Sequence, residues 1–211
     1  MSSMANILAP DWLPSFRGSR CLELLRLYKP ESAQHLVQFY EDDSFITENV
    51  AFLAAKALAA GNSSVVVATE PHLEQIHERL ADFGVNAAAF RESGQYIAVD
   101  AAEALSRFMV DGNPDNAKFN ETIGSVLRSA EKNSANGFVF AFGEMVGLLC
   151  ASNKPAAAVR LEQLWNSLAE RHRFSLYCAY SLSSLGNEPN TDDLLQICAE
   201  HALTIPTETS L

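Results

Sequence analysis

Short runs of β-branched and aromatic residues alternate along the chain with longer segments in which apolar residues recur every three or four positions. The first pattern is typical of strands and the second of amphipathic helices. Their alternation predicts β-α units joined into a largely parallel sheet. The five expected strands are His35–Tyr40, Ser64–Ala68, Tyr96–Val99, Phe138–Phe142 and Ser175–Tyr180.

Capping residues, glycines and prolines give the expected helix ends. Asp42 or Asp43 is expected to cap a helix that ends at Gly61, and Asp100, with Glu103 three positions later, to cap another. Prolines open further helices. These are expected over Pro71 to about Phe83, from Pro114 onward and over Pro155 to about Arg171, followed by a short helix at Asp192 to His201 and an extended end. The fold class is therefore α/β, a three-layer α/β/α sandwich with a mainly parallel sheet.

Residues 1–34 differ from the rest, because prolines and a glycine interrupt them and a helical apolar pattern is confined to Cys21–Tyr28. We predict an N-terminal arm with one short helix over 1–34 and one domain over 35–211.

The balance of charge argues against direct binding of nucleic acid. The chain of 211 residues has 26 Asp plus Glu against 15 Lys plus Arg, a net charge of -11, which repels phosphate backbones. It has no uninterrupted apolar run long enough to span a membrane, and its first residues lack the basic leader of a signal peptide. We expect a cytoplasmic protein without membrane contact.

The usual motifs of cofactor and nucleophile chemistry are missing. None of the 10 glycines precedes a lysine, so the phosphate-binding loop is absent, and neither the dinucleotide fingerprint nor the nucleophile elbow occurs. The cysteines, Cys21, Cys150, Cys178 and Cys198, are too widely separated for a typical metal motif or disulfide framework. We expect no catalytic residue, no metal and no cofactor, and interpret Cys178 as a buried structural thiol.

Ligands of parallel sheets bind beyond the carboxyl ends of the strands, so polar and aromatic residues near strand ends are the candidates. Each has an alternative structural interpretation: Glu144 and Asp43 as helix-terminal carboxylates, His35 as a backbone-satisfied side chain, and the tyrosines as lids of the core. The predicted ligand-binding residues are His35, Tyr40, Asp43, Glu144 and Tyr180.

Five ordered motifs resemble the MEDS domain, the sensory domain of methanogens, methylotrophs and the dichloromethane-responsive repressor. The tail segments Ile197–His201 and Ile205–Glu208 fit as well, and the resemblance covers about residues 35–208. One departure is Ser181, where the family usually has proline. The motifs are the nine residues from His35, the segment 107–115, Phe142–Val146, Leu161–Asn166 and Leu176–Tyr180.

The resemblance implies a prokaryotic, mainly bacterial, signal-input domain related to the RecA and KaiC ATPases but without their phosphate-binding loop. Such domains are thought to sense small organic compounds such as hydrocarbon derivatives, often while fused to histidine kinases or DNA-binding domains. No kinase or DNA-binding module follows in this chain, so we expect a stand-alone sensor that relays its signal to a kinase, a transcription regulator or a second copy of itself in a homo-oligomer.

Two alternatives remain open at this stage. One is a protein-interaction module without a small ligand, which would have a solid core and no polar-lined cavity. The other is a degenerate nucleotide-binding RecA/KaiC-like protein in which Glu144 and Asp100 hold a cation and phosphates, against which the acidic charge and the missing lysine argue.

Overall fold

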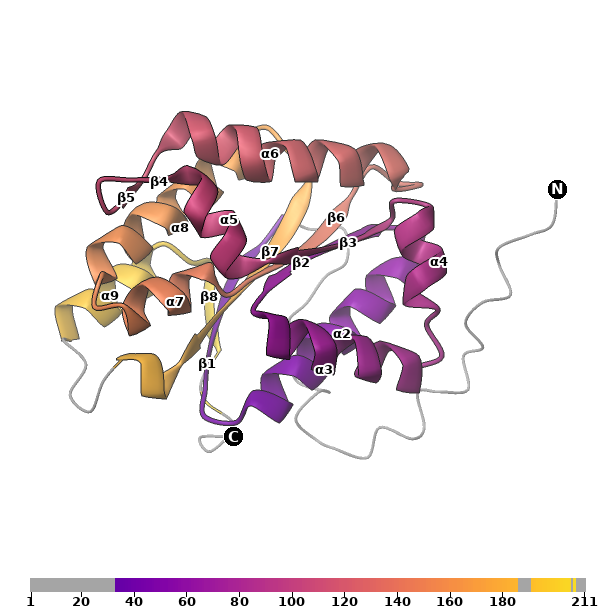
Figure 1. Cartoon of the computed structure of the whole chain (residues 1–211), viewed down its shortest axis with the longest axis horizontal. Helices are drawn as coiled ribbons and strands as arrows, with labels where there is room; N and C mark the ends of the chain where they lie inside the picture. Colours follow the sequence, from indigo (N-terminus) through magenta and orange to yellow (C-terminus); the bar gives the residue numbers. More distant parts are fainter. Residues whose placement is uncertain (1–32, 186–190, 206, 208–211) are drawn as a thin grey trace, which may run out of the picture.

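The computed structural model describes residues 33–185, 191–205 and 207, so the predicted arm helix Cys21–Tyr28 lies outside the described residues. Six parallel strands form the central sheet in the order β3-β2-β6-β7-β1-β8, and helices cover both of its faces (Figure 1). This confirms the three-layer α/β/α sandwich. The strands are β1 (His35–Tyr40), β2 (Ser63–Ala68), β3 (Tyr96–Asp100), β6 (Val139–Gly143), β7 (Phe174–Ser181) and β8 (Leu203–Ile205).

Two hydrophobic clusters, one on each face of the sheet, form the core. Alternate residues of the strands feed the two clusters: Leu36 belongs to one and Val37 to the other. One face carries α2 (Asp43–Ala59), α3 (Glu70–Asp82) and α4 (Ala87–Glu92). The other carries α5 (Ala101–Phe108), α6 (Asn116–Asn133), α7 (Met145–Ala151), α8 (Pro155–Ala169) and α9 (Thr191–Ala199).

The path of the chain creates a crevice at the carboxyl ends of the central strands. From β1 the chain crosses to β2 and then to β3 along the face of α2 and α3, and it returns to β6, β7 and β8 along the opposite face. The helices that follow β2 and β6 therefore leave these neighbouring strands toward opposite faces. Ligands of open parallel sheets bind at such a switch point.

The five predicted strands are present, with each end within one residue of its predicted position. Asp42 is the N-cap of α2 and accepts a hydrogen bond from the Ser44 N–H at 2.8 Å, whereas Asp43 is the first helical residue. The Asp100 carboxylate accepts the Glu103 N–H at 2.7 Å and caps α5 as predicted. Local capping chemistry was therefore readable from the sequence.

One local expectation, a helix that starts at Pro114, was wrong, and the structure adds detail at three other places. Pro114 lies in β5 (Asn113–Pro114), which pairs with β4 (Met109–Val110) in a small hairpin, and α6 begins only after the N-cap Asp115. The hairpin turns at Asp111 and Gly112, both with positive φ. The expected extended end is a sixth strand, β8, paired in parallel with β1. Helices α4 and α7 were not predicted, because each is shorter than two helical turns of regular periodicity.

No helix within the described residues is both long enough and apolar enough to cross a membrane.

Candidate functional site

A cavity of about 160 Å³, here called the carboxyl-edge pocket, opens where β1, β2, β6 and β7 end. One wall is apolar and comes from Leu148 and Ala151 of α7 and Ala179 of β7. The other wall carries polar side chains from the segments that follow the strands. These are Tyr40, Asp43, Thr69, His72, Glu144, Ser181 and Ser184.

Glu144 lies at the switch point itself and joins the two strands there. Its carboxylate is almost fully buried, with the residue 6% exposed. One oxygen accepts the Thr69 N–H at 2.6 Å, and the other lies 2.6 Å from Nδ1 of His72. Thr69 and His72 follow β2 whereas Glu144 follows β6, so a single side chain connects the two diverging loops.

His72 bridges two carboxylates at the mouth of this pocket. Its Nδ1 contacts Glu144, and its Nε2 lies 3.5 Å from Oδ1 of Asp43. Burial of His72 disfavours its charged form, but the hydrogen bonds and negative charges of Glu144 and Asp43 outweigh burial and raise its pKa. The pocket is therefore lined by a histidine whose protonated form is stabilised by two carboxylates.

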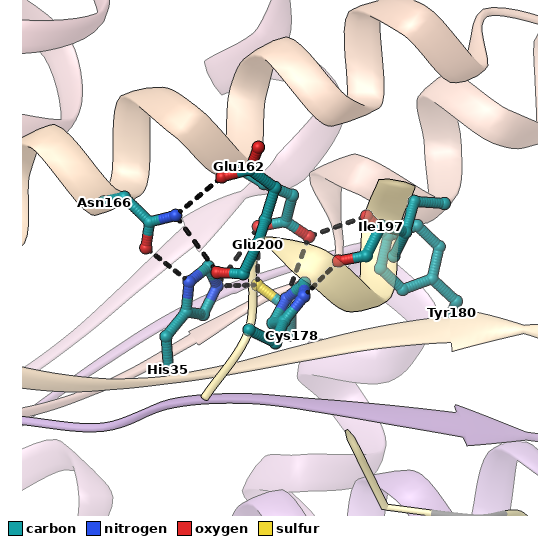
Figure 2. Close-up of polar contacts among 8 residues, drawn as sticks. His35, Glu162, Asn166, Cys178, Tyr180, Ile197 and Glu200 are labelled. Atoms are coloured by element: carbon teal, nitrogen blue, oxygen red, sulfur yellow. Dashed lines mark hydrogen bonds and ion pairs between the residues drawn. The ribbon is translucent and has the colours of Figure 1, made fainter. Parts of the chain in front are cut away.

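A second polar group lies inside the protein, between the sheet and α8, and is called here the histidine-cysteine cluster: His35, Glu162, Cys178 and His201. Figure 2 shows Glu162 and Asn166 reaching down from the helix toward His35 and Cys178 on the strands. Glu162 has no exposed surface. Its carboxylate lies 3.2 Å from His35 Nε2, 3.3 Å from His201 Nε2 and 3.3 Å from Cys178 Sγ.

Burial and charge act in the same direction on Cys178 and Tyr180 and in opposite directions on Glu162. Burial, reinforced by the charge of Glu162, raises the pKa of Cys178 and of Tyr180, whose hydroxyl donates to Glu162 at 2.6 Å. Burial alone would raise the pKa of Glu162 too, but its close contacts with His201 and His35, which carry the opposite charge when protonated, outweigh burial and hold that pKa well below its usual value. Glu162 is thus a buried carboxylate.

A second cavity, of about 410 Å³, adjoins the histidine-cysteine cluster at the amino-terminal end of β1. Its polar lining consists of Gln34, His35, Asn166, Glu200 and His201. Its apolar lining includes Trp165, a residue only 1% exposed that packs edge-on against Phe119.

The structure divides the five predicted ligand-binding residues between two places. Tyr40, Asp43 and Glu144 line the carboxyl-edge pocket. His35 begins β1 at the other end of the strand and belongs to the histidine-cysteine cluster, to which Tyr180 is hydrogen-bonded through Glu162.

Sequence reasoning missed His72, Glu162 and His201. His72 lies in the first turn of α3, directly after Pro71, and its sequence context carried no signal of a binding role. Glu162 did carry one, because it interrupts the apolar stripe of α8 between Leu161 and Leu164 and a fully buried acid requires partners. His201 lay in a tail motif whose position in space only the fold reveals.

The comparison with known families agrees with this architecture. A family model described as the methanogen/methylotroph, DcmR sensory domain, MEDS, matches residues 34–202, which is most of the chain. No curated protein sequence matches this chain. The match spans both the carboxyl-edge pocket and the histidine-cysteine cluster, and the chain belongs to the MEDS family of sensory domains.

Proposed function

We propose that this sensory domain binds a small organic ligand in the carboxyl-edge pocket and relays the binding event to a signalling protein. The observation that carries the proposal is the placement of Glu144 and His72. A buried carboxylate and a histidine meet at the point where β2 and β6 send their chains to opposite faces, and they border a cavity.

The lining of the pocket restricts the ligand. Its volume of about 160 Å³ is below the roughly 300–1,000 Å³ of pockets for drug-sized molecules, so the compound is small. Leu148, Ala151 and Ala179 would contact an apolar body, while Asp43 and the hydroxyls of Ser181 and Ser184 would accept or donate hydrogen bonds. This combination favours a short hydrocarbon derivative with one polar group.

A sensing role fits these residues better than catalysis or nucleotide binding. The loop between β1 and α2 consists of Glu41 and Asp42, and Asp43 follows, so three acidic residues stand beside the pocket and would repel phosphates. Signalling would pass through the segments that line the pocket, α7 and the 3₁₀ helix η3 (Leu182–Leu185), which contact each other. The partner we propose is a histidine kinase or a transcription regulator.

The test is a thermal-shift screen with one- to three-carbon alcohols, amines, carboxylates and halides. We expect at least one compound to raise the melting temperature of the wild type but not of Ala151→Phe, in which a ring added at an exposed position of α7 fills the pocket. Ala102→Phe, at an exposed position of α5 outside the pocket lining, is the matched control. A compound that stabilises both variants equally binds elsewhere and contradicts the proposed site, and a shift caused only by a magnesium-nucleotide would favour the RecA-like alternative.

A further inference from the structure

We propose that the histidine-cysteine cluster is a binding site for one divalent transition-metal ion of zinc type. The ligands would be Nε2 of His35, Nε2 of His201, the thiolate of Cys178 and the carboxylate of Glu162. The proposal is independent of ligand binding at the carboxyl-edge pocket, with which the cluster shares no residue.

The side-chain amide of Asn166 determines which ring nitrogen of His35 carries a proton. The side-chain nitrogen of Asn166 donates to the Glu200 carbonyl at 3.1 Å and to the Glu200 carboxylate at 3.0 Å. The amide oxygen of Asn166 therefore faces Nδ1 of His35, 2.8 Å away, and can only accept. Nδ1 of His35 carries the proton, and in a neutral ring Nε2 presents a lone pair.

The same reasoning applies to His201. Its Nδ1 lies 2.7 Å from the Ile197 carbonyl oxygen, which can only accept, so Nδ1 is the donor. Nε2 of His201 is buried and makes no hydrogen bond within the described residues, and the side chain has no exposed surface. This nitrogen points at the Glu162 carboxylate, another acceptor, 3.3 Å away.

With both histidines neutral, the four groups cannot satisfy one another. The Cys178 thiol has a single proton, which can serve either Glu162 at 3.3 Å or His35 Nε2 at 3.5 Å. At least one histidine lone pair then faces a buried carboxylate, an arrangement that costs free energy. A cation at the centre turns every one of these acceptors into a ligand.

The spacing of the atoms fits tetrahedral coordination. Zinc bonds of about 2.0–2.1 Å to nitrogen or oxygen and about 2.3 Å to sulfur place neighbouring ligand atoms roughly 3.3–3.6 Å apart. Among Nε2 of His35, Sγ of Cys178 and Oε2 of Glu162 the three separations are 3.2, 3.3 and 3.5 Å. Nε2 of His201 lies 3.3 Å from the other carboxylate oxygen, Oε1, and one ligand atom from each of the four residues lies within 4.8 Å of the others. One thiolate and one carboxylate also balance the charge of a divalent ion, as a buried site requires.

The surroundings of the cluster have the form of an outer coordination shell. Metal-bound histidines typically donate their second N–H to a carbonyl or carboxamide, as His201 does to Ile197 and His35 to Asn166. Tyr180 donates to the Glu162 oxygen at 2.6 Å and holds that carboxylate in place. The adjoining cavity of about 410 Å³ reaches His35 and His201 and would give an ion access.

The chemistry of the donors selects the kind of ion. Imidazole and thiolate favour zinc, cobalt or ferrous iron over magnesium and calcium, which prefer oxygen ligands. The four ligands come from β1, β7, α8 and the turn between α9 and β8. A bound ion would therefore fasten the C-terminal segment to the centre of the sheet.

The test uses tag-free, chelator-treated full-length protein and Co²⁺ as a spectroscopic probe. We expect one cobalt ion per chain, a thiolate-to-cobalt absorption band in the near ultraviolet, and loss of that band when Zn²⁺ is added. X-ray absorption of the zinc form should show one sulfur at about 2.3 Å and nitrogen or oxygen at about 2.0–2.1 Å. Failure of folded protein to bind either ion at micromolar concentration, or a first shell without sulfur, overturns the proposal.

Matched variants locate the site. Cys178→Ser should abolish the cobalt band, whereas Cys198→Ser, on α9 outside the cluster, should keep it. His201→Gln should lose the ion and His77→Gln should not, and Asn166→Ala should weaken binding by about 10–100-fold through the orientation of His35. Circular dichroism checks that each variant is folded. If folded Cys178→Ser kept the cobalt band, the ion would lie elsewhere and the assignment would be refuted. If Cys178→Ser does not fold, the X-ray absorption of the wild type and the Asn166→Ala affinity decide.

Discussion

The two histidine-carboxylate groups of this chain are built from similar residues but differ in what surrounds them. Glu144 and His72 lie at the carboxyl edge beside a pocket, and the nearby Asp43 side chain is 63% exposed. Glu162, His35 and His201 lie under α8, where the Glu162 and His201 side chains have no exposed surface and a thiol takes the place of the second carboxylate. The first group therefore reaches solvent through Asp43, whereas the second is enclosed, and its buried charge needs a partner of opposite charge.

The largest difference between the two groups should appear when the acid is removed. Glu162→Ala leaves two histidines, a thiol and the Tyr180 hydroxyl without their common partner, and we expect it to lower the free energy of unfolding by about 3–5 kcal/mol. Glu144→Ala leaves the Thr69 N–H and one nitrogen of His72 without their acceptor and should cost about 1–3 kcal/mol. Urea unfolding measures both, and an equal or reversed order would contradict the comparison.

Removal of a bound metal ion by a chelator should change stability through the histidine-cysteine cluster and not through the group of Glu144 and His72. If the histidine-cysteine cluster holds zinc, ion at 100 times its dissociation constant should add about 2.7 kcal/mol to stability, which a chelator then removes. The same shift is expected in Glu144→Gln, because the carboxyl-edge pocket contributes no ligand. Thermal unfolding with and without chelator tests this, and loss of the zinc effect in Glu144→Gln would show that the two groups are coupled.

The carboxyl-edge pocket should contribute a pH dependence of its own. The pKa of His72 is raised in the folded protein, so its contribution to stability is fully present below its unfolded pKa of about 6.5 and is lost as the pH rises through the folded pKa. From about pH 6 upward the wild type should therefore lose more stability than His72→Gln. Urea unfolding across this range measures the difference, His77→Gln serves as control, and parallel pH profiles of wild type and His72→Gln would refute it.

The smallest effects on stability are expected at two surface positions, one at the start of α2 and one at the start of α5. Asp42→Ala removes the N-cap of α2 beside the pocket and should cost about 1 kcal/mol. Glu103→Gln removes an exposed ion pair with Arg107 and should cost only about 0.3–0.5 kcal/mol. Chemical denaturation resolves the two, and a Glu103→Gln effect larger than that of Asp42→Ala would contradict this ranking.

The sequence predicted the sheet well because strand and helix signals are local. Continuous β-branched residues in Ser64–Ala68 and capping at Asp100 each act within a few neighbours, and the structure places both within a residue of the prediction. Pro114 misled the prediction of a helix start because the same residue suits a short edge strand, and only the pairing of Asn113 with Val110 decides between them.

The two candidate sites were predicted only in part, because each depends on pairs distant in sequence. Glu144 meets His72 across 72 positions, and His35 meets Cys178 across 143. Spacing rules for metal ligands search within one segment, so ligands carried by a strand, a helix and a tail turn escape them. A buried acid in the stripe of α8 was the one local sign, and it gives no direction to its partners.

The short strand β8 protects its longer neighbour. β1 has the sequence His-Leu-Val-Gln-Phe-Tyr, and among the residues that the structure describes only the three of β8 pair with the side of it that faces away from β7. Release of β8 would leave apolar β1 with unpaired backbone groups, a template on which another chain can add a strand. A change that loosens the turn at His201 should therefore appear first as aggregation, before the domain itself unfolds.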